Sequence, residues 1–285
     1  MTAGLGLKES LITFLTNKKA IIGLVIVLFF LTIGAFAPYL APYKPMSTEF
    51  PTWLGPSRQH LLGTTDLGQD LLSQFIWGAR LSLLVGISVS FLVQIIALSV
   101  GVTAGYYGGW IGNVLTTFTN VFLILPTFPL MIVIAAFLGA RGSSTIILVL
   151  VITSWAWGAR VFRSQTLSLK ERGFIEAAKV AGERDFRIIF GELIPNMFPL
   201  IVSNFIGTTS FAVITESALR FIGLGSVNEV TWGTMLFWAS NALALAQDAW
   251  WWFIPPGLSI ALFGLGLALI NFAIDEVSNP RLRKV

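Results

Sequence analysis

The side chains that ordinarily carry out chemistry are scarce in this sequence of 285 residues. It has no cysteine and a single histidine, His60, which excludes thiol catalysis, disulfides, cysteine-ligated metals and a paired-histidine metal site. We expect His60 to be an ordinary loop residue. No G-x-x-x-x-G-K-[ST] segment occurs, so the chain cannot bind ATP through a phosphate-binding loop. We therefore predict no catalytic residue, no metal site and no cofactor in this chain, and any use of ATP must come from a partner.

The most polar stretch of the chain, GFIEAAKVAGERDFRIIFGELIP, covers residues 173–195. On a helix with 100° per residue, one narrow stripe carries charges of alternating sign, spaced for i,i+3 or i,i+4 pairs. They are Arg172, Glu176, Lys179 and Glu183, and the opposite face carries Phe174, Ala177, Ala178 and Ala181. Gly182 suits a C-terminal turn with positive φ, and Asp185 is placed to cap a second short helix that ends before Pro195. The pattern predicts helix, turn, helix.

Two interpretations of this stretch follow from the helical wheel. An amphipathic helix could rest on the lipid headgroups. Alternatively, the mostly alanine face, centred on Ala178, could dock in a cleft of another protein. Alanine provides little apolar area for insertion into a membrane, but it lets a second protein surface approach closely.

The chain as a whole is strongly apolar: 55% of its residues are hydrophobic, 11% are charged, and its mean hydropathy is +0.81. These values indicate an integral membrane protein. Windows of about 20 apolar residues, the length that crosses a bilayer, predict six helical spans. They run approximately over Ala20–Ala37, Leu81–Ala104, Val114–Leu138, Ile146–Val161, Pro199–Thr215 and Trp252–Ile274. Pro126 and Pro129 are expected to break the third span. A cleavable signal peptide is the alternative for the first span, but its long apolar run favours a retained helix.

The basic residues orient these spans, because cytoplasmic loops hold an excess of Lys and Arg. With the N-terminus inside, thirteen of the eighteen lie inside: Lys8, Lys18, Lys19, Arg160, Arg163, Lys170, Arg172, Lys179, Arg184, Arg187, Arg281, Arg283 and Lys284. The outside keeps Lys44, Arg58, Arg80, Arg141 and Arg220. We therefore predict that both termini and residues 173–195 are cytoplasmic. The net charge of +4 follows from this asymmetry and needs no nucleic-acid partner.

The polar stretch resembles the EAA loop (EAA-x3-G-x9-I-x-L-P) of the permease subunits of ABC importers. Glu176-Ala177-Ala178, Gly182 and Pro195 stand at the expected offsets. Glu192 replaces the isoleucine of the pattern, and Ile194 replaces its leucine. In that family the loop forms a coupling helix that sits in a cleft of the cytoplasmic ATPase subunit, which favours the docking interpretation.

Three further segments resemble the dipeptide, oligopeptide and nickel importer group of these permeases. HLLGTTDLGQDLLSQFIWGARLSL, residues 60–83, is similar to its GTDxLGRDxxSRxxxGaRxSL segment, with Thr65, Gln69 and Gln74 as departures. ESALRFIGLG, residues 216–225, and WGTML, residues 232–236, resemble ExxLSFLGLG…WGxML. The ending NFAIDEVSNPRLR keeps Asn271, Pro280, Arg281, Leu282 and Arg283. The resemblance covers nearly the whole chain, and its opening suggests the C-type subunit of the permease pair.

The resemblance implies an all-α integral membrane protein of a prokaryotic inner or plasma membrane, with about six transmembrane helices and the ABC importer permease fold. We expect residues 1–80 to form a cytoplasmic tail, the first span and an outer loop. Residues 81–285 would form the permease core of five spans, with the coupling loop at about 163–195. The implied function is half of an ATP-driven import pathway for peptides or related small solutes, with oligosaccharides or nickel as alternatives.

The partners implied by the resemblance are a second homologous permease subunit in a heterodimer, two cytoplasmic ATPase subunits that bind ATP and Mg, and an extracytoplasmic solute-binding protein. The implied coupling residues are Phe174, Glu176, Ala177, Ala178, Ala181, Gly182, Asp185 and Pro195. Polar side chains inside the spans are candidates to line the pathway: Gln94, Asn120, Ser154, Ser203 and Asn204.

Two functions from other classes remain as alternatives. A secondary transporter or channel would need intramembrane charges or repeated broken helices. The i,i+4 pair Glu216 and Arg220 is instead expected to be a structural ion pair near the interface. A membrane enzyme would need a clustered acid, base or metal set. The sequence shows neither pattern clearly.

Overall fold

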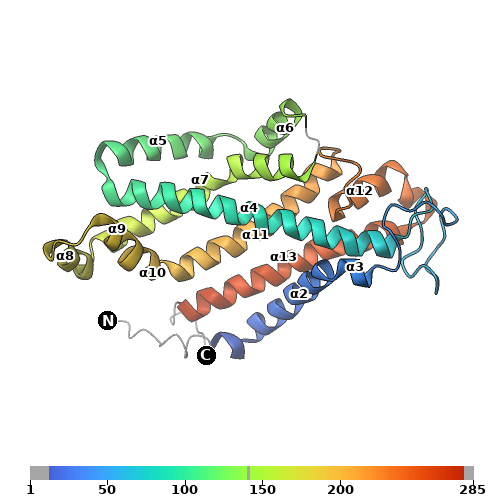
Figure 1. Cartoon of the computed structure of the whole chain (residues 1–285), viewed down its shortest axis with the longest axis horizontal. Coiled ribbons are helices and arrows are strands. Elements are labelled where there is room, and N and C mark those ends of the chain that lie inside the picture. Colours follow the sequence, from blue (N-terminus) through green and yellow to red (C-terminus); the bar gives the residue numbers. More distant parts are fainter. Residues whose placement is uncertain (1–12, 140–141, 279–285) are drawn as a thin grey trace.

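The computed structural model describes residues 13–139 and 142–278, and nearly all of its regular structure is helical. Five helices are long and apolar enough to cross a membrane: α2 (Lys18–Ala35), α4 (Leu71–Tyr107), α7 (Ser143–Lys170), α11 (Phe198–Phe221) and α13 (Trp250–Ser278). They lie roughly side by side along the long axis of the molecule (Figure 1). Helices α4, α7, α11 and α13 extend beyond their apolar windows, whereas α2 begins and ends two residues earlier than predicted. The span positions were therefore predicted and their ends were not.

The remaining predicted span is a bent pair, α5 (Gly109–Ile124) and α6 (Thr127–Phe137), with an angle of 90° between the two helices. The break lies at Leu125 and Pro126, both of which have extended backbone conformations. Pro126 therefore breaks the span as expected. Pro129 does not, because it lies in the first turn of α6, where a missing N–H group is tolerated.

The centre of the molecule is α4, which packs along α7 and α11, while α2 packs along α13. Two glycines let α4 and α7 approach closely. A Cβ atom at Gly101 would lie 2.5 Å from the carbonyl oxygen of Ala159, and one at Gly105 would lie 2.8 Å from Cβ of Thr166. The hydrophobic core along this contact continues into the segment after α7 through Ile175, Ile188 and Leu193. The segment predicted to couple is therefore part of one packed unit with the spans.

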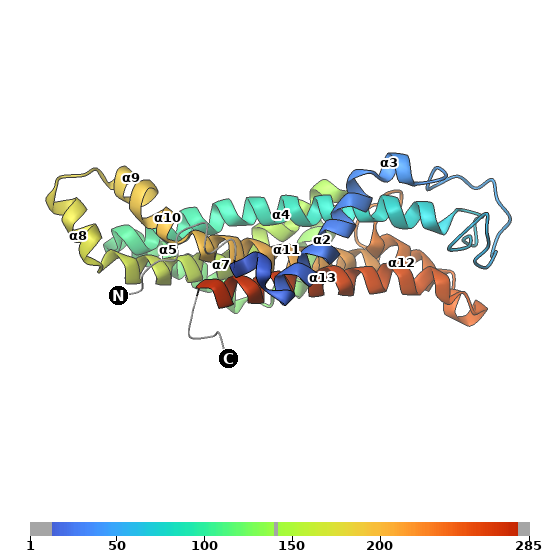
Figure 2. The same ribbon diagram turned by 90° about the horizontal axis from the view of Figure 1, so that it is seen from below.

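The beginning of α2 and the end of α13 lie toward the end of the molecule that carries the segment after α7 (Figures 1 and 2). The Asn17 side chain donates a 2.7 Å hydrogen bond to Glu276, and Lys19 forms an ion pair with the same carboxylate. If the bent pair is counted as one span, the described residues contain six candidate spans, the number predicted from the sequence. The predicted cytoplasmic residues Lys8, Arg281, Arg283 and Lys284, together with Arg141 and Pro280, lie outside the described residues.

The opposite end carries the loop before α4 and the short helix α12 (Trp232–Asn241), which the apolar windows did not indicate. Asp70 caps α4 by accepting a 2.8 Å hydrogen bond from the Ser73 amide. The other carboxylate oxygen lies 2.8 Å from Nδ1 of His60, which is 3% exposed and packs against the rings of both Tyr43 and Phe50. His60 is thus a buried loop residue that helps to fix the start of α4.

Candidate functional site

The predicted coupling segment lies between α7 and α11 and projects at one end of the molecule (Figures 1 and 2). It contains α8 (Gly173–Val180), a turn, and a helical stretch formed by α9 (Asp185–Arg187), the π-helix η1 (Ile188–Leu193) and α10 (Ile194–Asn196). The predicted arrangement of a helix, a turn and a second helix is therefore confirmed. Gly182 has φ +76°, and no other side chain or backbone atom lies within 4 Å of the position where a Cβ would stand. The turn therefore needs glycine for its backbone conformation and not for space.

Two details of this segment differ from expectation. Asp185 does not cap α9, because its Oδ1 accepts a 2.7 Å hydrogen bond from the hydroxyl of Tyr106, and Arg184 occupies the cap position without a side-chain hydrogen bond. The second helix also does not end before Pro195. The preceding π-turn carries the helical backbone through Ile194, and Pro195 lies in the first turn of α10, where its missing N–H is tolerated.

Helix α8 is held to the spans by one face and exposes another. Ile175 is fully buried, and Ala178 packs against the same core. Ala178 is therefore not the centre of a free face, as the wheel suggested, because that side of α8 is covered by the chain itself. The exposed apolar side chains are Phe174, Ala177, Val180 and Ala181, of which Val180 is 90% exposed. The surface available to a partner is thus rotated from Ala178 toward Ala177 and Ala181.

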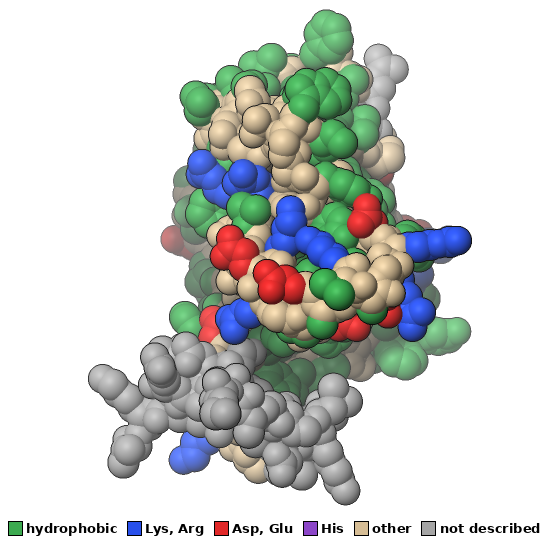
Figure 3. Space-filling model, turned by 90° about the vertical axis from the view of Figure 1, so that its left-hand side faces the viewer, with side chains coloured by type: hydrophobic (Ala, Val, Ile, Leu, Met, Phe, Trp, Pro, Cys, Tyr) green, Lys and Arg blue, Asp and Glu red, His purple; other side chains and the backbone are tan. Residues whose placement is uncertain are grey.

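Charged side chains of both signs lie among hydrophobic ones on the end of the molecule that carries α8 (Figure 3). The expected pairs along α8 are not among the ion pairs of the described residues. Glu183 instead lies 3.6 Å from Arg187, and the Lys179 ammonium lies 5.6 Å from the centre of the Tyr106 ring. Glu176 is exposed and forms none of these ion pairs, so its carboxylate is accessible to a partner surface.

Tyr106 connects the coupling segment to the end of α4. Besides its hydrogen bond to Asp185, its carbonyl oxygen accepts a 2.5 Å hydrogen bond from the Lys170 ammonium at the end of α7. Its ring is within 6 Å of two ammonium groups, those of Lys170 and Lys179. The side chain of Tyr106, itself part of α4, thus lies against residues of α7, α8 and α9. The sequence gives no local signal for this role, because the partners of Tyr106 are more than sixty residues away.

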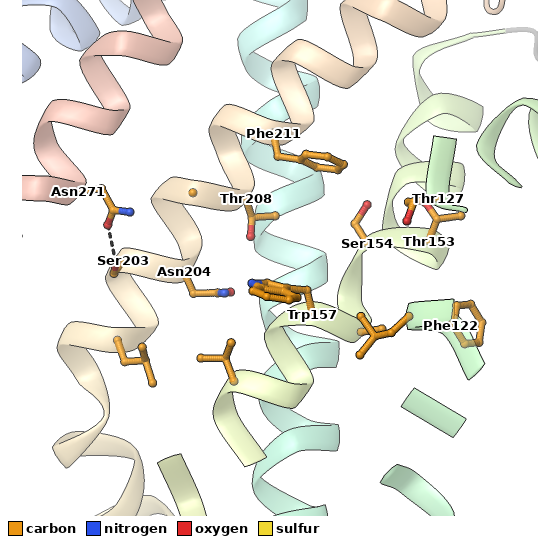
Figure 4. Close-up of a pocket in the computed structure, with 15 residues that line it drawn as sticks. Phe122, Thr127, Thr153, Ser154, Trp157, Ser203, Asn204, Thr208, Phe211 and Asn271 are labelled. Carbon is orange, nitrogen blue, oxygen red and sulfur yellow. Dashed lines mark hydrogen bonds between the residues drawn. The ribbon is translucent and has the colours of Figure 1, made fainter. Parts of the chain in front are cut away.

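A cavity of about 660 Å³ lies among α5, α6, α7, α11 and α13. Ser203, Asn204 and Thr208 on α11 lie across from Trp157 and Ser154 on α7 (Figure 4). Ser203 donates a hydrogen bond to Asn271 of α13. Oγ of Ser154 and Oδ1 of Asn204 are buried and have no hydrogen-bond partner within the described chain. The cavity therefore combines aromatic side chains with uncharged polar side chains in its lining.

Three of the five predicted pathway residues, Ser154, Ser203 and Asn204, line this cavity. Asn120 lines a smaller cavity between α4, α5 and α7. Gln94 is only 8% exposed and donates a 3.2 Å hydrogen bond to the carbonyl of Ile201, so it connects α4 to α11 and does not line the cavity. Trp157 and Thr208 also line this cavity and were not predicted from the sequence, because nothing local distinguishes them from other tryptophans and threonines of the spans.

The opposite end of the spans contains the expected ion pair. Nε of Arg220 lies 2.6 Å from Oε1 of Glu216, and both side chains are fully buried. Nη2 of Arg220 also donates to Glu229, at 2.8 Å, and to the hydroxyl of Ser143, at 2.6 Å. The pair is therefore part of a cluster that fastens α7, α11 and the loop before α12. The i,i+4 spacing indicated the pair, whereas the long-range partners had no sequence signal.

Comparison with known families identifies the class of protein. Residues 97–284 match the family model described as the inner membrane component of binding-protein-dependent transport systems, and residues 7–61 match the N-terminal transmembrane domain of oligopeptide transport permease C. The first match covers more than half of the chain, so the chain belongs to this family of ABC importer permeases. It is a multi-pass inner-membrane transport subunit and not an enzyme.

Curated relatives resemble the chain over nearly its full length. The dipeptide transport system permease DppC of Alkalihalophilus pseudofirmus is 36% identical over 94% of this chain and 87% of its own. The di/tripeptide transport system permease DppC of Pseudomonas aeruginosa is 35% identical, covering 97% of this chain and 93% of its own. The oligopeptide transport system permease OppC of Bacillus subtilis is 30% identical, covering 97% and 90%. These names are consistent with the C-type subunit of a permease pair.

A solved structure supports the fold. A chain of the MetNI methionine ABC transporter, determined in inward-facing conformations, matches with a TM-score of 0.57, over 75% of this chain and 98% of that chain. The sequence identity is 19%, so this likeness concerns the arrangement of helices alone. Together with the family match, this likeness supports an importer permease fold. Membership of the family implies in general a permease partner, an ATPase and a binding protein.

Proposed function

We propose that this chain is the C-type permease subunit of a peptide importer and forms half of its translocation pathway. The observation that carries the proposal is the exposed apolar surface of α8, which lies beyond the ends of the spans within a segment that matches the EAA loop. An apolar surface that lies among charged side chains outside the spans fits docking to a protein cleft. The names of the curated relatives favour peptides over oligosaccharides or nickel.

The cavity of about 660 Å³ is the proposed part of the pathway contributed by this subunit. Its uncharged polar groups, Ser154, Asn204 and Thr208, suit the backbone amides that all peptides share. Its aromatic side chains, Trp157 and Phe211, provide apolar contact without selecting one side chain. Among the described residues no three His, Asp or Glu side chains converge to hold a metal ion, so no observation here favours nickel.

The proposed complex contains a second homologous permease subunit, in a heterodimer, and two cytoplasmic ATPase subunits that bind ATP and Mg. An extracytoplasmic solute-binding protein delivers the peptide. ATP-driven closure of the ATPase pair would displace α8, and the contacts of Tyr106 would carry that displacement to α4 and α7. The coupling residues are Phe174, Glu176, Ala177, Ala178, Ala181, Gly182, Asp185 and Pro195, where Ala178 and Asp185 act by holding the loop to the spans.

The direct test is to purify the intact complex from its native membrane and identify the copurified binding protein and its ligand by mass spectrometry. The reconstituted complex should then take up that peptide in an ATP-dependent manner. Isolation of a binding protein loaded with a sugar or a metal, with no peptide uptake, would overturn the substrate class while leaving the permease assignment intact.

A further inference from the structure

A second, smaller cavity of about 180 Å³ lies between α4, α5 and α7 and shares no lining residue with the proposed pathway. Its polar lining comes from Arg160 and Arg163 on α7 and from Thr116, Thr119 and Asn120 on α5. The rest consists of small or aliphatic residues of α4 and α7, such as Gly101 and Ala104, which create the space. A water molecule occupies about 30 Å³ of liquid volume, so the cavity has room for an anion of the size of phosphate.

The cavity carries two positive charges and no carboxylate lines it. Neither Arg160 nor Arg163 takes part in the ion pairs of the described residues. The Nε atom of Arg163 is buried and has no hydrogen-bond partner in the described part of the chain. The guanidinium of Arg160 makes only a long contact, 3.4 Å, to Oδ1 of Asn120. Arg160 is exposed and Arg163 is partly buried, so both guanidinium groups are accessible to an anion that enters from the membrane surface.

The position of the cavity points to the membrane surface. The helix α7 has 28 residues, more than the roughly 20 needed to cross the hydrocarbon core, so its last turns reach the headgroup region. Arg163 precedes Lys170, the last residue of α7, by seven residues, or about 10 Å along the axis. Beside the cavity, α5 exposes the apolar side chains of Val114, Phe118 and Val121, against which acyl chains could lie.

We propose that this cavity binds the phosphate of an anionic phospholipid from the cytoplasmic leaflet, held by Arg160 and Arg163 with the amide of Asn120. The guanidinium group suits phosphate because it offers several donors in a fixed plane. Basic pockets between transmembrane helices on the cytoplasmic side are typical sites for anionic headgroups. The inference rests on the proposed orientation of the chain, and it is independent of the peptide substrate.

The test uses the full transport complex in nanodiscs of phosphatidylcholine with 20% phosphatidylglycerol, about one lipid in five. After transfer to detergent, native mass spectrometry measures the ratio of phosphatidylglycerol to phosphatidylcholine that stays bound. Arg160→Gln and Arg163→Gln should each lower this ratio about fivefold. Arg172→Gln and Arg187→Gln, which remove the same charge from exposed sites on the coupling segment, should leave it unchanged. Thr116→Phe, which fills the cavity without removing a charge, should lower it too.

Inorganic phosphate distinguishes the two ligands that could supply a phosphate group to this cavity, a phospholipid headgroup and the free anion. If a few millimolar phosphate, on the order of intracellular levels, stabilises the delipidated complex and the phosphatidylglycerol preference is absent, the lipid assignment is wrong and the site takes the free anion. Equal retention in the cavity variants and the control variants would overturn the site altogether. Labelling of Arg172→Cys from outside intact cells would refute the orientation, and hence the leaflet, independently of the lipid measurement.

Discussion

The hydroxyl of Tyr106, at the end of α4, donates a 2.7 Å hydrogen bond to the carboxylate of Asp185, at the start of α9. This contact joins a membrane-spanning helix to the segment that we propose to dock on an ATPase. A hydrogen bond to a charged group contributes about 1.5–3 kcal/mol, less where the carboxylate is exposed, as it is here. The contact can therefore transmit a displacement of the coupling loop to α4.

Replacement of Tyr106 by phenylalanine should uncouple hydrolysis from transport. Tyr106→Phe keeps the ring but removes the hydrogen bond, so we expect peptide uptake per ATP hydrolysed to fall severalfold, while the ATPase subunits still copurify. The matched control is Tyr107→Phe, because this neighbouring phenol is 48% exposed. Uptake and hydrolysis are measured together in proteoliposomes. An unchanged ratio in Tyr106→Phe would show that the contact carries no coupling.

The turn at Gly182 should not tolerate a side chain. A non-glycine residue in the left-handed region costs about 1–2 kcal/mol, so Gly182→Ala should open the turn more often, by about fivefold to thirtyfold. Trypsin cleavage after the neighbouring Arg184 in the purified chain reports that opening, and uptake should fall in parallel. Gly182→Asn should be milder, because asparagine accepts this conformation better. Gly173→Ala is the control, since Gly173 has an ordinary φ and no close neighbour. Equal cleavage of Gly182→Ala and wild type would refute a glycine requirement.

The prediction about Gly182 came from the sequence, as did the span positions and the Glu216–Arg220 pair. All of these depend on residues within one helical turn or on composition over about 20 residues. What the sequence could not supply is which side of a helix meets the rest of the chain. Ala178 and Phe174 are both apolar on the wheel of α8, yet only Ala178 packs inward, because Ile175 beside it enters the core.

Long-range contacts account for the other differences. Asp185 follows a turn, so its position predicts a helix cap, but its carboxylate instead accepts a hydrogen bond from Tyr106, 79 residues away. Arg220 has Glu216 within one turn, whereas Ser143 lies 77 residues before it. The helix α12 was missed because its ten residues are too few to form an apolar window. These features arise from the packing of the spans, which local spacing does not encode.

The topology should place α8 in the cytoplasm. A single introduced cysteine can be labelled without background from native thiols, because the chain contains no cysteine. A cysteine at the exposed position Arg172 should react with an impermeant maleimide only after the membrane is opened, because basic residues concentrate on that side. A cysteine at Arg58, in the outer loop, should react in intact cells and serves as the positive control. Labelling of Arg172→Cys in intact cells would invert the proposed orientation.

The cluster around Arg220 should make stability depend on acid pH through Glu229. Partial burial raises the pKa of Glu229. Hydrogen bonds from Ser143 and Arg220 lower this pKa by more than burial raises it, so the pKa lies below its ordinary value of 4.5. A carboxyl whose pKa is lowered on folding stabilises the protein fully above its unfolded pKa, and this contribution is lost as the pH falls through the folded pKa. We therefore expect the melting temperature to fall as the pH drops below about 4.5.

Glu229→Gln tests this origin. This substitution should lower the free energy of unfolding by about 1 kcal/mol near neutral pH, a value reduced by solvent screening of a partly exposed group. It should also flatten the decline of the melting temperature at acid pH. Glu49→Gln, which removes an exposed carboxylate of the outer loop, should keep the wild-type profile. Thermal melting of the detergent-purified chain from pH 7 to pH 3, about the range over which carboxylates titrate, provides the measurement. The same slope in Glu229→Gln and wild type would refute the assignment.

The most direct test of the account concerns the exposed surface of α8, which we propose docks on an ATPase subunit and not on lipid. Ala178→Trp would disturb the chain's own core, so the informative variant is Ala177→Trp, at an exposed position. Overfilling a close-packed contact costs about 1–3 kcal/mol, which weakens binding by roughly fivefold to more than a hundredfold. On a lipid-facing helix the same change would be harmless or favourable, because tryptophan suits the membrane interface.

The measurement is the amount of ATPase subunit that copurifies with the chain, normalised to the chain itself, together with peptide-stimulated ATP hydrolysis. Ser240→Trp, at an exposed position on α12 at the other end of the molecule, controls for the effect of an added tryptophan. We predict that Ala177→Trp loses both the ATPase subunits and stimulated hydrolysis, while Ser240→Trp retains the ATPase subunits. Wild-type copurification and wild-type stimulation in Ala177→Trp would contradict a coupling role for residues 173–195.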